Sequence, residues 1–259
     1  RTRIPLNATL PAVPAERVPE VLAKYEGEIQ ELKIKVAEKG QSLADDIARV
    51  AAARETLPNA RLKVDANMGY TLAGALEALR KLCEYGIIYA EQPVASIEDM
   101  AALRFAIAKE GLPARIAADE SIRKAEDPLK VARANAADLM VIKAAPLGGV
   151  RRALALVEQA QLPAVVSSAL ESSVGIATGA SLAASLPTLR YGCGLGTVSL
   201  MAEDVTDEPL IARDGFMDLR AIVPSPQRLE RLATDKQTRQ WWVERVTACY
   251  RVLERACGL

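Results

Sequence analysis

Residues 61–93 read RLKVDANMGYTLAGALEALRKLCEYGIIYAEQP, and this stretch decides the fold. The run 61–67 is short and rich in residues that favour strands, and the run 87–93 has the same character. Between them, the apolar positions of 72–82 recur at three- and four-residue steps, which indicates one face of a helix. The stretch therefore predicts a strand, a helix and a second strand, the unit from which parallel sheets are built.

The same unit repeats outward in both directions along the chain. Successive strand-like runs start about 24–29 residues apart, the length of one strand, one helix and two short loops. Eight such runs occur, at 4–10, 32–37, 61–67, 87–93, 114–120, 139–145, 163–169 and 191–197. Helical spacing of apolar residues is found between them, at 43–57, 72–82, 100–108, 129–134 and 150–160.

This alternation predicts an α/β fold, a parallel barrel of the (β/α)7β type, over residues 1–200. An open doubly wound sheet is the alternative, although no GxGxxG follows a strand as a dinucleotide site would require. Residues 201–259 lose the alternation. We expect them to form a C-terminal extension, irregular over 203–226 and helical over 227–257, that packs on the barrel or on a further domain.

The composition excludes several classes of function. Lysine plus arginine and aspartate plus glutamate both number 33, so no charge excess suggests a nucleic-acid or anionic-membrane partner. No apolar run reaches the roughly 18 residues that span a bilayer, and no signal-peptide core is present, so we expect a cytoplasmic protein. Histidine is absent, which leaves acid–base chemistry to Lys, Asp, Glu, Tyr or Cys.

Polar residues gather where the predicted strands end. In a parallel barrel these carboxyl-terminal ends meet at one mouth, where active sites are built. Side chains alternate along a strand, so Lys33 and Lys35 share a face, as do Asp65 and Asn67. The remaining candidates at strand ends are Glu91, Asp119, Glu120, Lys143, Ser167 and Ser168.

Acids on three successive strands predict one cation site. Oxygen donors of this kind suit Mg²⁺ or Mn²⁺ rather than zinc. Any one of these acids alone is explained as a cap or a surface group, whereas three of them flanked by lysines are not. For Ser167 and Ser168 two interpretations stay open, a plain helix cap or an anion site that holds a substrate carboxylate.

Five ordered motifs, LKIKV, VDAN, EQP, AADES and VIK, resemble the enolase superfamily in its muconate-lactonizing subgroup. They lie within residues 30–145, and NATLPAV, APLGGV, SSALESSVG and CGLGT extend the resemblance over residues 4–200. Within the subgroup, the chain is most similar to o-succinylbenzoate synthases of the actinobacterial type. The segments IAADESIRKAEDP, KAAPLGGVR and VVSSALESSVG carry that similarity.

The resemblance implies a metal site. Asp65, Glu91 and Asp119 match the ligands of a Mg²⁺ ion, for which Mn²⁺ is a possible substitute. The implied reaction is the dehydration of a small carboxylate, 2-succinyl-6-hydroxy-2,4-cyclohexadiene-1-carboxylate. Its product is o-succinylbenzoate, in menaquinone biosynthesis.

The resemblance also implies a pair of acid–base residues. Lys35 matches the acid–base group on the second strand and Lys143 matches the lysine opposite it, a pairing of lysine with Mg²⁺ that is known for the superfamily. Lys33 is expected to support Lys35 through its positive charge. The expected substrate contacts are Asn67, Ser167, Ser168 and Gly194.

Other activities of the superfamily remain open. N-acylamino acid racemases use the same two lysines on opposite faces of the substrate, and they are the main alternative. Dipeptide epimerases are less similar, because the chain has CGLGT where they usually carry an Asp-x-Asp on the eighth strand. Muconate cycloisomerisation is a further relative that we rank lower.

One departure from the family pattern concerns the capping domain. Family members normally begin with a domain of α+β type that closes over the mouth, whereas this chain opens at the first predicted barrel strand. We expect the cap to be absent, removed or supplied as a separate partner, with the tail 227–259 helping to build it. A barrel without a cap that serves as a non-catalytic scaffold therefore stays open, and the sequence leaves the oligomeric state undetermined.

Overall fold

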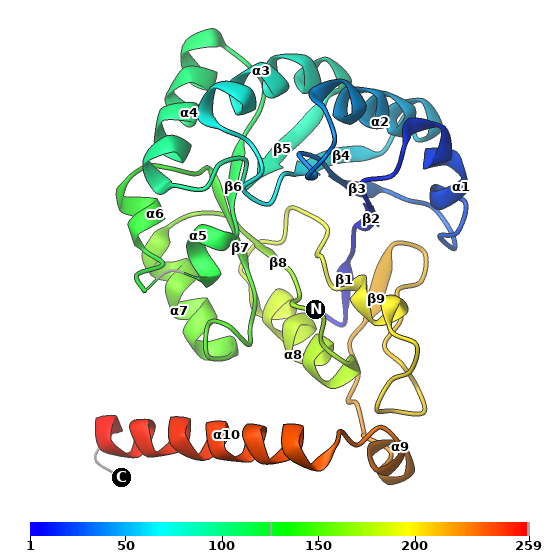
Figure 1. The fold of residues 1–259 in the computed structure, drawn as a ribbon, viewed down its shortest axis with the longest axis vertical. Coiled ribbons are helices and arrows are strands. Elements are labelled where there is room, and N and C mark those ends of the chain that lie inside the picture. The colour runs from blue at the N-terminus through cyan, green and yellow to red at the C-terminus, as the bar shows by residue number, and fades with distance from the viewer. Residues whose placement is uncertain (125, 258–259) are drawn as a thin grey trace.

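The structure, a computed structural model, describes residues 1–124 and 126–257. Its centre is a curved sheet of seven parallel strands in chain order, with helices on the outside (Figure 1). The strands are β2 (Ala8–Leu10), β3 (Glu31–Lys35), β4 (Arg61–Asp65), β5 (Ile87–Glu91), β6 (Ile116–Ala118), β7 (Leu139–Ile142) and β8 (Ala164–Val166). Each falls within or overlaps a predicted strand, so the predicted parallel α/β barrel is confirmed.

The eighth strand closes the barrel through very few contacts. The segment predicted as this strand, 191–197, forms isolated parallel bridges on both sides, Leu6–Cys193 and Ser167–Gly194. A Cβ at Gly194 would lie 2.6 Å from the Ser167 hydroxyl oxygen, so any larger residue there would displace the Ser167 side chain. The eighth strand therefore consists of two bridges rather than a regular ladder, because the chain turns into the 3₁₀ helix η3 (Gly196–Leu200) directly afterwards.

The predicted first strand, 4–10, is divided in two. β1 (Arg3–Pro5) pairs antiparallel with β9 (Phe216–Asp218) outside the barrel, and only β2 joins the parallel sheet. Between them, Leu6 donates its N–H to Gly215 O at 2.8 Å and Asn7 donates to Cys193 O at 3.0 Å. The segment after residue 200 is thus fixed to the barrel by a pairing between distant parts of the chain, which no local pattern reveals.

Helices cover the outer face of the sheet, and most begin at a capping side chain. Ser42 and Asp45 cap α2 (Leu43–Thr56) reciprocally. Ser96 accepts the N–H of Asp99 at 3.0 Å, so α4 (Ile97–Glu110) begins before the predicted residue 100. The helix predicted at 129–134 is a single turn that ends at Arg133, two residues before Asn135, which has a φ of 51°. The helices of the barrel are α1 (Val18–Leu22), α2 (Leu43–Thr56), α3 (Leu72–Leu82), α4 (Ile97–Glu110), α5 (Glu120–Arg123), α6 (Lys130–Arg133), α7 (Val150–Ala160) and α8 (Ser173–Ser185), with the 3₁₀ turns η1 (Ala15–Arg17) and η2 (Cys83–Tyr85).

The buried apolar side chains form two groups. The larger group lies between the sheet and the helices and includes Ile34, Leu62 and Leu79. A smaller group packs separately, and its two tyrosines meet edge to face at 5.4 Å. Its members are Tyr89, Ala117, Leu139, Val141, Val165 and Tyr191. Since Tyr89 shares a strand face with Glu91, this smaller group fills the barrel interior. It packs below the polar residues at the mouth of the barrel.

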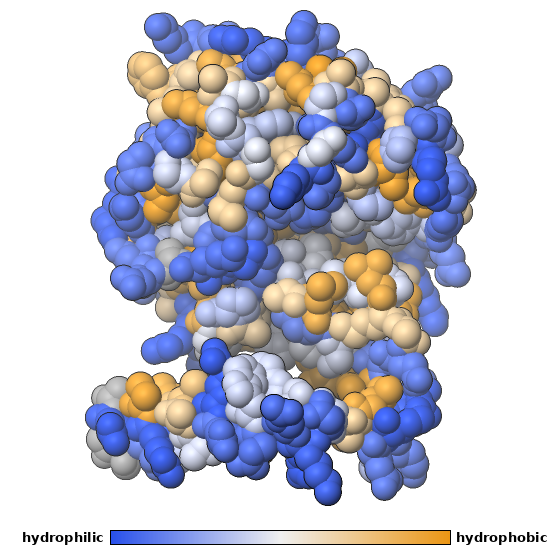
Figure 2. All heavy atoms as spheres, viewed as in Figure 1, coloured by the Kyte–Doolittle hydropathy of each residue, from blue (hydrophilic) through white to orange (hydrophobic). Residues whose placement is uncertain are grey.

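The C-terminal tail ends in two helices, α9 (Pro226–Arg231) and α10 (Lys236–Cys257). α10 lies across the bottom of Figure 1, apart from the sheet, and Trp241 and Trp242 on it are 51% and 53% exposed. Figure 2 shows hydrophobic residues among hydrophilic ones along this part of the surface. The packing of the tail on the barrel or on a cap stays a prediction. In the described part of the chain, no helix has both the length and the apolar character that a membrane span requires.

Candidate active site

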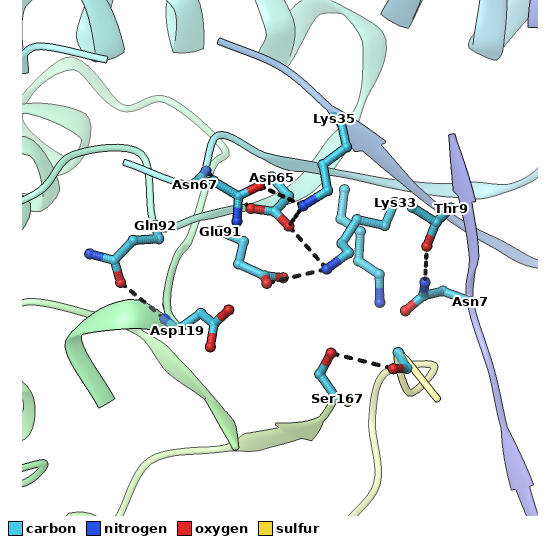
Figure 3. A network of polar contacts seen from close by, with 12 residues as sticks. Asn7, Thr9, Lys33, Lys35, Asp65, Asn67, Glu91, Gln92, Asp119 and Ser167 are labelled. Atoms are coloured by element: carbon cyan, nitrogen blue, oxygen red, sulfur yellow. Dashed lines mark hydrogen bonds and ion pairs between the residues drawn. The ribbon is translucent and has the colours of Figure 1, made fainter. Parts of the chain in front are cut away.

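The site is built on one row of the sheet. Lys35, Asp65 and Glu91 are direct register partners on β3, β4 and β5. Neighbours in one row of a sheet point to the same face, so all three side chains enter the barrel. Asp119 lies two residues beyond Ala117, the partner of Glu91 on β6, and therefore continues on the same face. Figure 3 shows Lys35, Asp65, Glu91 and Asp119 directed into one region of the interior.

Lysine side chains hold the carboxylates of this row. Lys33 Nζ lies 3.0 Å from Asp65 Oδ2 and 3.3 Å from Glu91 Oε1. Lys35 Nζ lies 2.6 Å from Asp65 Oδ2 and 2.5 Å from Asn67 Oδ1. The structure therefore brings five of the predicted site residues into direct contact (Figure 3).

A second set of ion pairs surrounds Asp119. Lys143, which directly follows β7, places its Nζ 2.7 and 3.0 Å from the two oxygens of Asp119. Arg123 donates to Asp119 at 3.2 Å and to Glu120 at 2.7 Å. Asn67 reaches Glu120 at 3.3 Å and so links the two sets. We call the charged residues at this end of the barrel the mouth layer: Lys33, Lys35, Asp65, Glu91, Asp119 and Lys143.

Burial and neighbouring charge compete in the mouth layer. Burial favours the neutral amine of Lys33, but the carboxylates of Glu91 and Asp65 outweigh it and hold the pKa of Lys33 above its ordinary value. At Asp65, burial disfavours the charge, but Lys33 and Lys35 outweigh burial and lower the pKa overall. At Glu91, burial and then the charge of Asp65 raise the pKa to about 7. Glu91 is thus an acid whose negative charge the lysines do not fully compensate.

The mouth layer has the donor chemistry of a magnesium site, but its side chains are not gathered around one point. Within residues 1–124 and 126–257, no three acidic side chains form a ready-made metal-binding group. The sequence predicted convergence of Asp65, Glu91 and Asp119, whereas Lys33 lies between the first two and Lys143 holds the third. Buried carboxylates repel one another unless a cation stands between them, and ammonium groups do so here. The raised pKa of Glu91 shows that the neighbouring lysines do not fully compensate the negative charge at this position. A Mg²⁺ ion bound by carboxylate oxygens would compensate it, because Mg²⁺ prefers hard oxygen ligands.

The backbone is strained where the strands enter the site. Ala37, Asn67 and Gln92 follow β3, β4 and β5, and all have a positive φ, of 58°, 43° and 36°. Such values are uncommon for residues other than glycine and often occur at functional sites. Gln92, which sequence reasoning did not select although it belongs to the EQP motif, is fully buried. Its Oε1 accepts the N–H of Asp119 at 3.0 Å, so it fixes the backbone of a predicted metal ligand.

The predicted substrate-binding serines lie at another part of the mouth. Ser168 donates to Gly194 O at 3.0 Å and lies 2.9 Å from the Thr197 hydroxyl, and Ser167 donates to Gly194 O at 3.4 Å. In the described part of the chain no hydrogen bond joins these serines to the mouth layer. They directly follow β8 and contact the closing segment at Gly194, four strands from Asp65 on β4, which leaves the interior between them and the acids.

A second charged layer lies one step deeper in the same strands. Glu31 accepts from Arg61 at 2.5 Å and from Lys63 at 3.2 Å. Lys63 donates to Gly192 O at 2.9 Å, and Gly192 donates its N–H to Glu31 at 2.8 Å. We call Glu31, Arg61, Lys63 and Gly192 the inner layer. The inner layer is absent from the predicted site residues, although Glu31 and Lys63 precede Lys33 and Asp65 by two residues and must share their face.

A family profile described as "Enolase C-terminal domain-like" matches residues 15–224. The chain therefore belongs to the enolase C-terminal domain-like family, and the resemblance to the enolase superfamily is confirmed. An o-succinylbenzoate synthase of Mycolicibacterium smegmatis is 54% identical over 254 residues, which are 98% of this chain and 76% of that protein. An o-succinylbenzoate synthase of Mycobacterium leprae is 50% identical over 259 residues, 100% of this chain and 75% of that protein. These relatives confirm the predicted similarity to o-succinylbenzoate synthases.

Solved structures show the same fold. A muconate lactonizing enzyme from Pseudomonas fluorescens, complexed with muconolactone, has a TM-score of 0.78 and 27% identity over 89% of this chain. A muconate lactonizing enzyme from Pseudomonas putida has a TM-score of 0.77 and 26% identity over 90% of this chain. The chain spans 64% of the first of these structures and 67% of the second, so both contain more than the part that is shared.

Proposed function

We propose that the chain is a magnesium-dependent carbon–oxygen lyase, an o-succinylbenzoate synthase. It would dehydrate 2-succinyl-6-hydroxy-2,4-cyclohexadiene-1-carboxylate to o-succinylbenzoate, a step of menaquinone biosynthesis. The observation that carries the proposal is the 50–54% identity to o-succinylbenzoate synthases over 98–100% of the chain. The lysines on β3 and after β7 support it, because they flank the acids of β4, β5 and β6 from both sides.

Lys35 is the proposed proton acceptor and donor. It takes the proton beside the substrate carboxylate, which leaves an enediolate, and then returns this proton to the departing hydroxide, which leaves as water. The ring becomes aromatic in the same step. To accept a proton Lys35 must be neutral, so it has to leave its ion pair with Asp65, whose oxygen lies 2.6 Å from Nζ. At 30% exposure, its side chain can reach a substrate that enters from the mouth.

Lys143 is proposed to stabilise negative charge from the opposite side. In a barrel of eight positions, β3 and β7 are four strands apart and therefore face one another across the interior. The Nζ of Lys143 contacts both carboxylate oxygens of Asp119, and this ion pair keeps the ammonium group of Lys143 at the mouth. A Mg²⁺ ion held by Asp65, Glu91 and Asp119 would supply electrostatic stabilisation of the substrate carboxylate as it gains charge.

N-acylamino acid racemisation is the second candidate activity. It is favoured by the same observation, two lysines on opposite sides of the barrel, because racemisation needs a proton donor and a proton acceptor on the two faces of one carbon. A non-catalytic scaffold is the third possibility. The acid–lysine set argues against it, since folding alone does not require charged groups at a barrel mouth.

One experiment tests all three candidates. The purified protein is assayed with Mg²⁺ for loss of the cyclohexadiene absorbance and, in parallel, for racemisation of N-succinylamino acids. Dehydration much faster than racemisation supports the proposal, and the reverse supports the racemase. Absence of both reactions in a folded protein that binds Mg²⁺ would leave the scaffold.

A further inference from the structure

A buried ion pair on α2 lies behind the mouth layer. Asp46 and Arg49 face inward from the helix, at 1% and 0% exposure, and Arg49 Nη1 lies 2.9 Å from Asp46 Oδ1. The other buried residues of α2 are the apolar Val50 and Ala53, and nothing in the helical pattern requires two charges beside them. The hydrogen bonds that Asp46 and Arg49 make to other residues explain why the pair is buried here.

Arg49 holds the backbone of two loops at the mouth. Its Nη1 donates to the carbonyl of Lys35 at 2.9 Å, and its Nε donates to the carbonyl of Val13 at 2.7 Å. Its Nη2 contacts the side chain of Gln41. One guanidinium therefore joins the end of β3 to the loop after β2, and the branched geometry of arginine is what allows this.

Asp46 holds the residues that follow Lys35. Its Oδ2 accepts the N–H of Ala37 at 2.9 Å and the hydroxyl of Tyr70 at 2.6 Å. Ala37 has the positive φ of 58° noted above, so this hydrogen bond stabilises a conformation that alanine rarely adopts. Tyr70 lies in the loop after β4, so the pair connects the loops that follow three consecutive strands.

We propose that Asp46 and Arg49 are positioning residues that fix the side chain of Lys35 relative to the substrate. The assignment rests on the proposed function only in giving Lys35 the proton transfer. Both anchors are close to that residue: Arg49 binds its own carbonyl, and Asp46 binds the N–H two residues later. Side-chain direction follows backbone direction, so loss of either anchor moves Nζ away from its contacts at 2.6 Å and 2.5 Å.

A contribution to stability alone is a weak explanation for the pair. A buried ion pair is weak evidence for stability, since desolvation offsets much of its attraction. A similar pair elsewhere in the barrel provides the comparison: Arg104 on α4 lies 2.7 Å from Asp138 and donates to Asn135 O at 3.3 Å. That pair holds the start of β7, the end of the strand opposite to the mouth, and it is partly exposed.

The test compares Arg49→Lys with the matched control Arg104→Lys. Each variant keeps the positive charge of the side chain and loses the several hydrogen bonds that the branched guanidinium group makes. For Arg49→Lys we expect kcat of dehydration to fall by about 10²-fold, the effect of roughly 1 Å of misplacement, with little change in KM. We also expect the amine of Lys35 to react several-fold faster in reductive methylation with formaldehyde and borohydride, measured by peptide mass spectrometry with Lys24 as the internal reference. Arg104→Lys should leave kcat, KM and the Lys35 methylation rate unchanged.

Tyr70→Phe serves as a second variant that removes one hydroxyl and keeps the ion pair. It should change kcat and the methylation rate of Lys35 in the same direction as Arg49→Lys, but by a smaller factor. If Arg49→Lys does not fold, the result for Tyr70→Phe tests the proposal instead. Wild-type kcat and wild-type Lys35 methylation in folded Arg49→Lys or Tyr70→Phe would overturn the proposal. If the wild-type protein does not dehydrate the substrate, the proposed function is wrong, and the methylation rates alone still decide whether the pair positions Lys35.

Discussion

The mouth layer and the inner layer both include residues of β3 and β4, and on these strands their members are two residues apart. The two layers nevertheless differ in how their buried charges are paired. In the inner layer, both carboxylate oxygens of Glu31 have partners, and Lys63 binds the backbone of Gly192. In the mouth layer, two acids share the single ammonium of Lys33, and the pKa of Glu91 is raised to about 7. The inner layer pairs both oxygens of its one acid, although burial still lowers the pKa of Lys63, whereas the mouth layer leaves the negative charge of Glu91 incompletely compensated.

The difference indicates which charges serve folding and which serve chemistry. The inner layer replaces strand pairing that the closing segment lacks, because Glu31 and Lys63 bind the N–H and the carbonyl of Gly192. A Cβ at Gly192 would lie 2.9 Å from the backbone of Leu6, so the segment has no room for a side chain there. The mouth layer binds no such backbone of the closing segment, and the raised pKa of its buried acid Glu91 is of the kind that clusters at functional sites. Four substitutions test this division.

The largest expected effect is on catalysis, from Lys35→Ala in the mouth layer. Dehydration should fall by about 10²–10⁴-fold, since the variant loses both proton acceptor and proton donor. The free energy of unfolding should change little, because the side chain is partly exposed and Asp65 keeps Lys33 as a partner. The measurements are steady-state kinetics on the cyclohexadiene substrate and urea denaturation. Dehydration at the wild-type rate would refute the proposed mechanism.

The inner layer should respond in the opposite way. Lys63→Met removes the ammonium that contacts Glu31 and Gly192, and we expect the free energy of unfolding to fall by about 3–5 kcal/mol. Lys24→Met is the control, because Lys24 forms an exposed ion pair with Glu20 and should cost at most about 1 kcal/mol. Urea denaturation measures both. Equal effects of the two substitutions would mean that the inner layer does not close the barrel.

Metal affinity should depend on the mouth layer alone. Asp119→Asn keeps an oxygen donor and removes one negative charge, so Mg²⁺ affinity should fall by about 10-fold or more. Asp138→Asn, which alters an ion pair at the other end of the barrel, should leave the affinity unchanged. Isothermal titration calorimetry with MgCl₂ gives both values. An unchanged affinity in Asp119→Asn would show that this carboxylate is not a ligand.

The smallest expected effect concerns pH, and it tests the poor compensation of Glu91. The folded pKa of about 7 lies above the ordinary value of 4.5, so the folded protein binds more protons than the unfolded chain between these values. Stability without divalent metal should therefore fall as pH rises through this window, by at most about 1.4 kcal/mol per pH unit. Glu91→Gln should flatten the slope, whereas Glu84→Gln, at an exposed site, should keep it. Urea denaturation in EDTA at pH 5, 6 and 7 gives the slopes, and parallel slopes for wild type and Glu91→Gln would contradict this account.

The sequence was most informative where a local pattern repeats. The predicted helices at 72–82 and 150–160 match α3 and α7, because apolar periodicity and capping act within one element. Lys33, Lys35, Asp65, Asn67 and Glu91 were selected because strand ends are local features, and the structure brings them into contact. The pairs Asp46–Arg49 and Glu31–Lys63 were missed, since their partners are backbone atoms of distant loops and of Gly192.

By itself, the sequence determined the α/β class, the order of the strands and the chemical type of the groups at their ends. These follow from side-chain periodicity and residue identity, which need no knowledge of long-range contacts. Only the tertiary structure decided how the barrel closes at Gly192 and Gly194, how β1 leaves the barrel to pair with β9, and which ammonium group meets which carboxylate. These features depend on contacts between segments far apart in the chain, and such contacts exist only after the sheet has curved and placed the segments side by side.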